Sequence, residues 1–575
     1  MSPPVFRPGP PELSDPRSTI GPVLVALVPG TENAGAFRTL SDAGVPEGDP
    51  VWTSDLAGAV AGLEREHSPR WVWASTARVY PDLLARGVRV GRCHDLEHAE
   101  GLLLAFTGRH AQPRGLGAAV ARLDGLPVPA DQGPPRKEAQ PTLFEPEPEP
   151  LPGGVSGIDA VVRVHAAQQA DRHAERLRLL TAAESASALT AAEMTFHGLP
   201  WRADVHVELL ERLLGPRPVP GARPEKLAVL ADRITAAFGG RAVNPDHPPG
   251  VVRAFAREGV EIPSTRAWVL KQVDHPAVEP LLAYKELSRL WVAHGWSWLD
   301  AWVSDGRFRP DYVVGGVVSG RWATRGGAAL QIPRVLRTAV RADPGWKLVA
   351  ADAAQLEPRV LAALSGDRRL VEVSGAGDLY TGLAVDAFDG DRDRAKIAML
   401  SAMYGGTSGE AGPLLAVLRR RFPEAVGYVE AAALSGEQGR AVRSRLGRTS
   451  PPPSEAWRDA VGNADGTEES ARRSRRVSRE WGRFTRNFVV QASAADWTAV
   501  LLGTLRRRLH DVAPAAHLVF FQHDEVLVHS PEADAEAVCR LVTESAAEAT
   551  ALVFGDTGVV FPIEATAVDG YAEAK

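Results

Sequence analysis

Cysteine is scarce in this 575-residue chain, which contains only Cys93 and Cys539. Two thiols exclude a disulfide framework and cannot form a zinc site unaided, so we expect unpaired cysteines in a reducing cytoplasm. Long hydrophobic runs are also lacking, since no stretch approaches the roughly 20 apolar residues that span a bilayer. The N-terminus shows no basic segment followed by an apolar run, which is the pattern of a secretory signal. These absences predict a soluble, cytoplasmic protein without a membrane partner.

Several familiar enzyme signatures are missing as well. The sequence has no internal repeat, P-loop, dinucleotide fingerprint or evident Ser-His-Asp arrangement. With 45% hydrophobic residues, the chain can bury several cores, and we expect two or three domains. The clearest boundary is residues 127–154, where proline and glutamate are too frequent for a folded core. We expect a semi-rigid linker or an exposed insertion there.

Charge is unevenly distributed along the chain. The formal net charge is −6, yet residues 392–508 contain 21 Lys or Arg and 12 Asp or Glu. A basic half on an acidic protein is the electrostatic footprint expected of contact with a phosphate backbone. Within this half, Thr449 to Arg476 has little periodicity and many Pro, Gly and Ser residues. It is predicted to be a mobile loop whose basic end contacts DNA.

Two segments far apart in the chain each place an aspartate at the end of a predicted strand. The apolar run 348–351 ends at Asp352 and is followed by a helix-periodic segment. The runs 518–521 and 526–528 flank Asp524 and read as a hairpin with acids at its tip. If the hairpin pairs beside the first strand, the two carboxylates can bracket the two Mg²⁺ ions of a phosphoryl-transfer site. Taken singly, an aspartate at a strand end is more often a helix cap or a surface residue than a catalytic group.

Between these segments, Arg392, Lys396, Leu400 and Tyr404 recur every four residues and share one face of a predicted helix. Arg offers a planar fork for phosphate oxygens, Lys a point charge, and Tyr a ring against which a base can lie. The alternative is an amphipathic helix with solvated basic residues and a half-buried tyrosine.

In this order, the three segments resemble the three signature motifs of family A DNA polymerases, and in particular a compact actinobacterial subgroup of bifunctional exonuclease and polymerase proteins. The first motif is matched by Asp352, Gln355, Glu357, Arg359, Val360, Leu361, Ala362, Leu364, Ser365, Gly366 and Asp367. The helix motif is matched by Arg392, Lys396, Tyr404 and Gly405, and the third motif by His523, Asp524 and Glu525. Further similarity lies in Ser319, Gly320, Arg321, the run Leu330 to Pro333, and the segment containing Arg483, Asn487 and Gln491.

The resemblance implies a role for each of these residues. Asp352 and Asp524 are expected to hold two Mg²⁺ ions, with Glu525 as a secondary acid beside them. The incoming nucleotide is expected to contact Arg392 and Lys396 through its triphosphate. Glu357 would help to exclude a 2′-hydroxyl, and Tyr404 would stack near the template base. The remaining expected nucleotide contacts are Gln355 and Leu400. The expected primer-template DNA contacts are Arg321, Gln331, Arg483, Asn487, Gln491 and His523.

The resemblance also implies an α+β, multidomain fold: a right-hand polymerase of palm, fingers and thumb, preceded by a degenerate RNase H-like α/β exonuclease domain. The expected order is an exonuclease-like domain at 1–126, a linker or insertion at 127–157, a late helix of that domain at 158–183, a thumb at 184–310, and palm and fingers at 311–575, with the fingers at about 370–445.

Proofreading is expected to be lost, because the usual acids of the exonuclease are missing. The predicted first strand, Val23 to Val28, carries no acid, and His165 and Gln169 stand where a Tyr and an Asp are usual. Asp95 and Glu97 form a D-x-E pattern, but they follow a later strand and are predicted to cap a helix.

The expected function is DNA-directed DNA synthesis from dNTPs by a nucleoid-associated monomer, in replication or repair. Departures from the family pattern keep alternatives open. Leu400 replaces an aromatic residue and Ser401 a glycine, which motivates a ribonucleotide-tolerant or template-relaxed polymerase. Other departures are Ala353, Ala354, Tyr380 and Ala492. A non-catalytic DNA-binding scaffold is the second alternative, although a scaffold has no need for both Asp352 and Asp524.

Overall fold

The structure is a computed structural model that describes residues 23–133, 151–375, 377–406, 411–462 and 467–574. The chain divides into two compact units, Met1–Leu189 and Thr190–Lys575. Helix α6 (Ala174–His197) runs through both this division and the expected start of the thumb at residue 184. The expected domain limits therefore stay predictions, and residues 134–150 of the expected linker lie outside the described residues.

The first unit is built on a mixed five-stranded sheet with the strand order β3-β2-β1-β4-β5. β1 (Leu24–Pro29) lies at the centre, antiparallel to β2 (Gly35–Leu40) and parallel to β4 (Arg70–Trp73). The outer strands are β3 (Val51–Thr53) and β5 (Arg92–Asp95). The helices are α1 (Leu56–His67), α2 (Thr76–Ala85), α3 (Leu96–Phe106), α4 (Leu116–Asp124) and α5 (Gly157–Ala170). An α/β unit is thus confirmed, whereas its likeness to an exonuclease remains a prediction.

Two details of the first unit bear on the expected loss of proofreading. β1 has the sequence LVALVP and carries no acid. Asp95 is the N-cap of α3 and accepts a hydrogen bond from the backbone N–H of His98 at 2.9 Å, which confirms its predicted capping role. The expected late helix at 158–183 is instead two helices, because Asp171 leaves the helical conformation and its side chain accepts from the N–H of His173 at 2.7 Å.

The second unit contains a four-stranded antiparallel sheet with the order β12-β13-β11-β14. β12 (His517–Gln522) and β13 (Glu525–Pro531) form the predicted hairpin, and β13 pairs with β11 (Trp346–Ala353), as expected. β14 (Ile563–Val568) lies on the other side of β11. The central position of β11 places Asp352 between two neighbouring strands.

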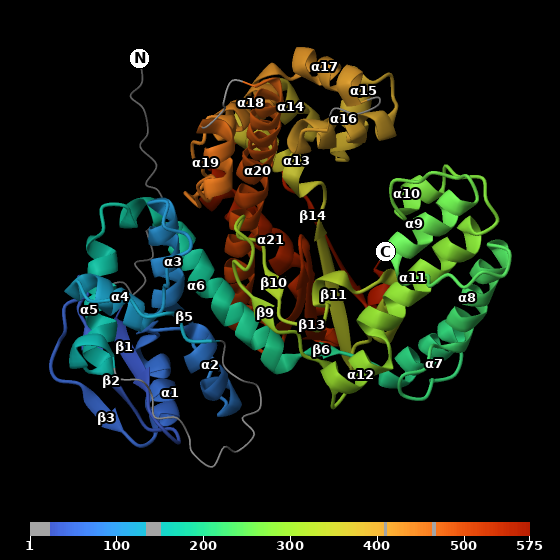
Figure 1. Ribbon diagram of the computed structural model, residues 1–575. Helices are drawn as coiled ribbons and strands as arrows, with labels where there is room; N and C mark the ends of the chain where they lie inside the picture. The colour runs from blue at the N-terminus through green and yellow to red at the C-terminus, as the bar shows by residue number, and fades with distance from the viewer. Residues whose placement is uncertain (1–22, 134–150, 376, 407–410, 463–466, 575) are drawn as a thin grey trace, which may run out of the picture. The chain divides into compact units, whose positions relative to one another are not determined.

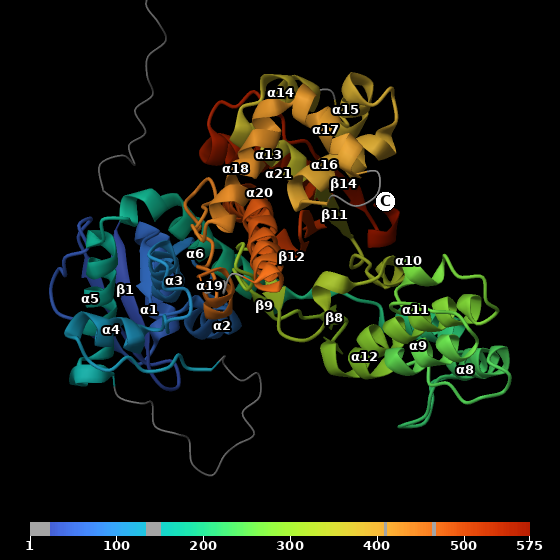
Figure 2. The same ribbon diagram turned by 45° about the horizontal axis from the view of Figure 1, so that its top comes forward.

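Helices gather in two groups beside this sheet (Figures 1 and 2). One group follows β11 and contains α13 (Leu356–Ser365), α14 (Arg368–Ser374), α15 (Leu379–Ala387), α16 (Arg392–Tyr404), α17 (Ala411–Arg421) and α18 (Pro423–Glu437). The other precedes β11 and contains α7 (Ala203–Leu214), α8 (Glu225–Ala237), α9 (Pro248–Arg257), α10 (Ala267–Leu270), α11 (Val278–His294) and α12 (Trp296–Trp302). A continuous apolar core joins this second group to the sheet through Leu348, Ala350, Phe520 and Leu527.

The longest helix, α20 (Glu468–Val512), corrects one expectation. The sequence predicts a loop over residues 449–476, but α19 (Glu455–Gly462) and the first turns of α20 lie within them. Thr467 caps α20 by accepting from the N–H of Ser470, and Glu468 pairs with Arg472 one turn later. This part of α20 is exposed on most sides, so it lacks the apolar periodicity by which a helix is usually predicted.

Among the described helices, α20 alone is long and apolar enough to cross a membrane, but 83% of its apolar window is buried inside the protein. It packs against α18 and α21 (Ala535–Phe554), as expected of a core helix.

Candidate active site

Asp352 and Asp524 lie on neighbouring segments of the chain, at one end of the four-stranded sheet in the second unit. The backbone N–H of Ala353 donates to the carbonyl oxygen of Asp524 at 3.2 Å, which fixes the hairpin tip beside the end of β11. His523, the first residue of the two-residue turn, has φ of 59°, a conformation typical of tight hairpins. Both aspartates are half-buried. The structure therefore brings together the two backbone segments that carry the predicted metal ligands.

Asp352 also stands in a row of carboxylates. In the register it is opposite Glu525 on β13 and Glu564 on β14. Because side chains alternate along a strand, all three share the face that carries Leu348 and Ala350. Like charges opposite one another destabilise a sheet unless cations neutralise them. The row therefore favours a cation at this end of the sheet.

Arg337 neutralises one member of the row. Its guanidinium donates to both carboxylate oxygens of Glu525, at 3.1 and 2.9 Å, and Glu525 is buried. Arg337 lies in turn over the ring of Tyr571, with 4.1 Å from its central carbon to the ring centroid. A bidentate pair of this kind fixes Glu525 in place. Glu525 is thus adjacent to the aspartates, but its charge is balanced by the protein.

A cavity of about 350 Å³ opens beside these carboxylates. Its lining includes Asp352, Glu525 and Glu564 from the sheet, and Gln355 and Asp378 from the segments that follow β11. Arg392, the first residue of α16, donates to both oxygens of Asp378, at 3.3 and 2.8 Å. The predicted cationic helix face thus begins at the wall of this cavity.

The Arg392 contact holds the pKa of Asp378 down at about 2, together with the backbone N–H of Thr381 that caps α15. The ion pair is consequently formed at neutral pH. Lys396, one turn further along α16, is exposed and has no ion pair among the described residues. One cation is therefore held in position by the protein, and the other is available to a ligand.

Gln355 is clamped at the corner between β11 and α13. It has φ of 48°, its amide donates to Asp378 at 3.2 Å, and its carbonyl oxygen accepts from the N–H of Leu379 at 3.2 Å. Buried Arg359 braces the same corner by donating to the carbonyl oxygens of Ala354 at 3.0 Å and Ser374 at 2.6 Å. This corner is rigid, and it fixes the position of the preceding Asp352.

Glu357 joins the two ends of the predicted nucleotide-binding surface. One of its carboxylate oxygens accepts from Arg321 and the other from the hydroxyl of Tyr404. Partial burial and the carboxylate of Glu357 raise the pKa of Tyr404, so the phenol stays protonated and donates. Leu400 lies on the same helix, half-buried, one turn before Tyr404. The structure therefore brings together the predicted sugar-side and base-side residues.

The predicted DNA-binding residues lie along one side of α20 and at the hairpin tip. Arg483, Asn487 and Gln491 are spaced by four residues and share one face of α20. At Gly405, which ends α16 with φ of 74°, an added Cβ would come within 2.9 Å of the Cγ of Arg483, so the two helices meet closely there.

The other DNA-binding predictions lie at the opposite end of this face. His523 lines a small cavity with Arg321 and with Ala495 of α20. Gln331 is exposed, and the neighbouring carbonyl oxygen of Leu330 accepts from Gln522 of the hairpin at 2.9 Å. Five of the six predicted contacts thus lie on α20 or in the small cavity beside it, whereas Gln331 lies near the hairpin.

The donor set at the sheet end suits magnesium. Carboxylate oxygens are hard ligands, and protein-bound Mg²⁺ usually takes one or two carboxylates and completes its shell with water and substrate phosphates. The described residues contain no group of three or more His, Cys, Asp or Glu that could hold a metal on its own. Asp352 and Asp524 therefore fit ions that depend on a phosphate-bearing substrate.

Three residues that support the site carried no assigned role in the sequence. Asp378 positions Arg392, Arg337 neutralises Glu525, and Arg359 braces the corner. Arg359 matches the first motif, and Asp378 precedes the segment LYTG, so either residue could have been found from its place in a motif. Arg337 is 188 residues from Glu525 and has no comparable signal.

The fold and the site define a class: an α+β protein in which carboxylates at the end of an antiparallel sheet lie beside a helix that presents cations. Residues 252–566 match the model of the family described as "DNA polymerase family A", and the chain belongs to that family.

Curated relatives support this assignment. The chain is 28% identical over 314 residues to the thermostable DNA polymerase I of Thermus aquaticus, covering 49% of this chain and 35% of that protein. It is 25% identical over 429 residues to DNA polymerase I of Geobacillus stearothermophilus, covering 66% of this chain and 45% of that protein. The chain thus spans less than half the length of these relatives.

A solved structure shares the fold. It is the POL domain of Pol1 from M. smegmatis, in complex with DNA primer-template and dNTP. The TM-score is 0.69 at 19% identity, and the match covers 96% of each chain. The α+β multidomain fold expected from the sequence is confirmed by this match.

Proposed function

We propose that this chain is a DNA-directed DNA polymerase that extends the 3′-hydroxyl of a primer with deoxynucleoside triphosphates. The single observation that carries the proposal is the adjacency of Asp352 and Asp524 at the sheet end beside the cationic face of α16. Family membership supports it, as does the solved relative described with primer-template DNA and dNTP.

Two Mg²⁺ ions are the proposed cofactors, held by Asp352 and Asp524. When bound, such ions supply Lewis-acid stabilisation of the attacking and leaving oxygens and neutralise the triphosphate. The protein contributes a rigid frame for them, because the Gln355 corner and the hairpin turn fix both aspartates.

In the proposed reaction, a bond forms between the primer 3′-oxygen and the α-phosphorus, and the bond from that phosphorus to the β-phosphate oxygen breaks. The hydroxyl proton passes to solvent and pyrophosphate leaves. Arg392 and Lys396 bind the β- and γ-phosphates, where negative charge accumulates as the leaving group departs. Asp378 keeps the guanidinium of Arg392 at the cavity wall, so little reorganisation is required when the nucleotide binds.

Selection of the nucleotide is assigned to the cluster of Arg321, Glu357 and Tyr404. The carboxylate of Glu357 is 14% exposed and held on both oxygens, so a sugar carrying an additional hydroxyl cannot displace it without breaking an ion pair. Tyr404 is 38% exposed, and its ring offers a surface for the template base. Primer-template DNA would follow Arg483, Asn487 and Gln491 along α20.

We also propose that the first unit does not proofread. The absence of an acid from β1 supports this proposal. His165 supports it as well, because a buried imidazole is a poorer ligand for Mg²⁺ than a pair of carboxylates. Incubation with 5′-labelled single-stranded DNA and Mg²⁺ or Mn²⁺ should give no 3′→5′ shortening. Metal-dependent shortening that is abolished on changing a residue between positions 1 and 126 would contradict the proposal.

The function itself is tested by primer extension. The full chain is mixed with a labelled primer-template, Mg²⁺ and one deoxynucleotide at a time, on four templates that differ in the next base. We expect extension only by the complementary nucleotide. Retained duplex affinity without extension on any template would instead identify a non-catalytic scaffold, and extension regardless of template would identify a template-relaxed enzyme.

A further inference from the structure

The sheet of the first unit ends in an edge strand, β3, that pairs only with β2 (Figure 1). Trp52 on this strand is 74% exposed, the largest exposed fraction among the described Trp, Tyr and Phe residues, and its neighbour Val51 is 50% exposed. Val45, in the loop between β2 and β3, is 59% exposed. An exposed sheet edge that carries apolar side chains is a template for pairing with another chain.

The opposite edge strand, β5, is protected. Its residues Cys93, His94 and Asp95 are buried, and the backbone N–H of Asp95 donates to the hydroxyl of Ser185 on α6 at 3.1 Å. Proteins protect sheet edges by covering them or by placing charged residues or proline on the strand. The side chains of β3 are exposed or half-buried, and its sequence VWT contains neither a charge nor a proline. The unit therefore closes one edge of its sheet and leaves the other open.

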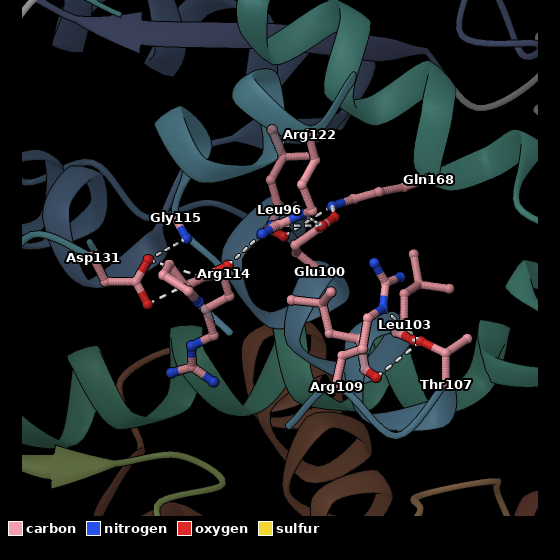
Figure 3. A network of polar contacts seen from close by, with 12 residues as sticks. Leu96, Glu100, Leu103, Thr107, Arg109, Arg114, Gly115, Arg122, Asp131 and Gln168 are labelled. Atoms are coloured by element: carbon pink, nitrogen blue, oxygen red, sulfur yellow. Dashed lines mark hydrogen bonds and ion pairs between the residues drawn. The ribbon is translucent and has the colours of Figure 1, made fainter. Parts of the chain in front are cut away.

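The helices α3 and α4 of the same unit show the contrast, because their polar groups have internal partners (Figure 3). Arg122 of α4 donates to Glu100 of α3 at 2.8 Å. Asp131 accepts from the backbone N–H groups of Arg114 and Gly115, at 2.8 and 2.7 Å, and so fixes the segment after α4 against the start of that helix. These groups are satisfied within the unit, whereas no strand among the described residues lies beside the outer side of β3.

The chain around β3 is strongly acidic. Residues 30–55 contain one basic residue, Arg38, which is occupied, since it donates to the carbonyl oxygen of Gly48 at 2.9 Å and to Asp159 at 3.2 Å. The same residues contain five acids, all exposed: Glu32, Asp42, Glu47, Asp49 and Asp55. A surface of one sign attracts a partner of the opposite sign and repels a phosphate backbone.

Two of these acids lie on the edge itself. The backbone N–H of Glu47 donates to the carbonyl oxygen of Thr39 on β2 at 2.9 Å, so the chain already runs beside β2 before β3 begins. Asp49 lies between Glu47 and β3. The edge therefore presents carboxylates followed by the exposed side chains of Val51 and Trp52.

From these contacts we infer that the outer edge of β3 binds an extended basic segment of another protein, which adds to the sheet as a sixth strand. Backbone hydrogen bonds to β3 supply part of the affinity, and Trp52 packs against an apolar side chain of the segment. Glu47 and Asp49 pair with its Lys or Arg side chains. A second copy of this chain is disfavoured, because its own edge carries the same acids. The inference does not depend on the proposed polymerase activity.

Fluorescence anisotropy with the full chain tests the inference. The probe is a pool of fluorescein-labelled peptides in which Lys alternates with Val, Ile, Phe or Tyr. One comparison pool carries Glu in place of Lys, and another carries Pro at the central apolar position, where it removes a backbone donor. We expect the basic pool to bind at least about tenfold more tightly than either comparison pool. Equal binding of the basic and proline pools would reduce the contact to charge alone and overturn the inference.

Matched variants locate the surface. Trp52→Ser should weaken binding of the basic pool by about tenfold or more, because it removes an aromatic anchor, and its exposure makes unfolding an improbable cause. Trp268→Ser is the control, since Trp268 is 60% exposed on α10 of the second unit, and binding should stay within about twofold. Equal losses in the two variants would contradict the assignment.

The charges are tested by a double variant. Glu47→Gln with Asp49→Asn should weaken binding by about threefold to tenfold, with a shallower dependence on salt. Glu66→Gln with Asp82→Asn removes two exposed carboxylates from α1 and α2 of the same unit and should change binding by less than about twofold. A loss as large in this control would refute the role of the β3 edge.

Hydrogen exchange separates strand addition from a contact of side chains alone. With the basic pool bound, backbone amides of β3 should exchange at least about tenfold more slowly, whereas those of α10 should be unaffected. Unchanged exchange at β3 would overturn the inference. Light scattering on the free chain provides a second check, because a dimer that Trp52→Ser dissociates would assign the edge to a second copy instead.

Discussion

In the proposed function, sugar selection depends on Glu357. Leu400 offers no aromatic face or hydroxyl to the incoming sugar, so discrimination falls to the carboxylate held by Arg321 and Tyr404. Glu357→Ala should raise the relative efficiency of ribonucleotide over deoxynucleotide incorporation by about ten- to a hundredfold, since it removes a contact of roughly 1.5–3 kcal/mol in discrimination. Steady-state kcat/KM for the two sugars with the same base measures the ratio.

Tyr404→Phe is the matched variant for this prediction. It keeps the ring but removes the hydroxyl that donates to Glu357, so its effect should have the same direction and be smaller. If neither variant changes the ratio, sugar selection lies elsewhere.

Arg392 binds phosphate in this account, and Asp378 positions it. Arg392→Gln should raise the KM for the nucleotide about tenfold or more, because it removes a charge-assisted hydrogen bond to phosphate. Asp378→Asn should raise it less, because the guanidinium remains but is no longer held. Arg394→Gln removes an exposed arginine from another face of α16 and serves as the control. A KM increase as large in Arg394→Gln as in Arg392→Gln would contradict the assignment.

At the scale of elements, α20 extends the predicted DNA surface beyond the site. Arg472, Arg476, Arg479 and Arg483 are exposed and recur at spacings of three or four residues, so they share the face that continues to Asn487. Changing the first three to Gln should weaken duplex binding at low salt. It should also make the dependence of log K on log salt shallower by about one unit for each phosphate that is no longer neutralised.

A charge-matched control is the triple change of Arg178, Arg368 and Arg540 to Gln, since these are 79%, 92% and 63% exposed on other helices. Binding measured by fluorescence anisotropy over a salt series should be unaltered in this control. The same salt slope in both triple variants would exclude α20 as a specific DNA-binding surface.

The elements also show what sequence alone can predict. β11 and the hairpin follow from short apolar runs bounded by polar turns, and α16 from its four-residue spacing, because burial leaves a period in the sequence. The first turns of α20 could not be predicted in this way, since they pack against little and their helicity depends on Thr467 and local ion pairs. The pairing of Arg337 with Glu525 joins residues far apart in sequence and follows only from the folded sheet.

At the scale of the molecule, buried neutral histidines link stability to pH. Burial lowers the pKa of His206, His294 and His529 to about 4. In His206, Nδ1 accepts from the indole of Trp201 at 3.3 Å, and Nε2 lies 3.0 Å from the carbonyl oxygen of His294, so the neutral ring satisfies both contacts.

The direction in which stability changes with pH follows from the protons taken up on unfolding. Below about pH 6.5 the unfolded chain protonates these rings, whereas the folded chain does not until about pH 4, so unfolding takes up protons. Stability should therefore fall as the pH decreases from about 6.5 to about 4. Thermal unfolding at about pH 7.5, 6.0 and 5.0 measures this. His67→Asn, at an exposed position, should leave the trend unchanged, and a midpoint that is constant or rises on acidification would contradict the account.

The central claim is that Asp352 and Asp524 form the reacting centre of a polymerase. Single-turnover incorporation of one complementary nucleotide, at saturating primer-template and Mg²⁺, tests it most directly with Asp352→Asn, Asp524→Asn and the control Asp569→Asn. Asp569 is a 71% exposed carboxylate that pairs with Lys347. We predict a decrease of about a thousandfold, or roughly 4 kcal/mol, in each of the first two, with DNA affinity retained and the control unaffected. Incorporation within about tenfold of the wild type in either variant would contradict the account.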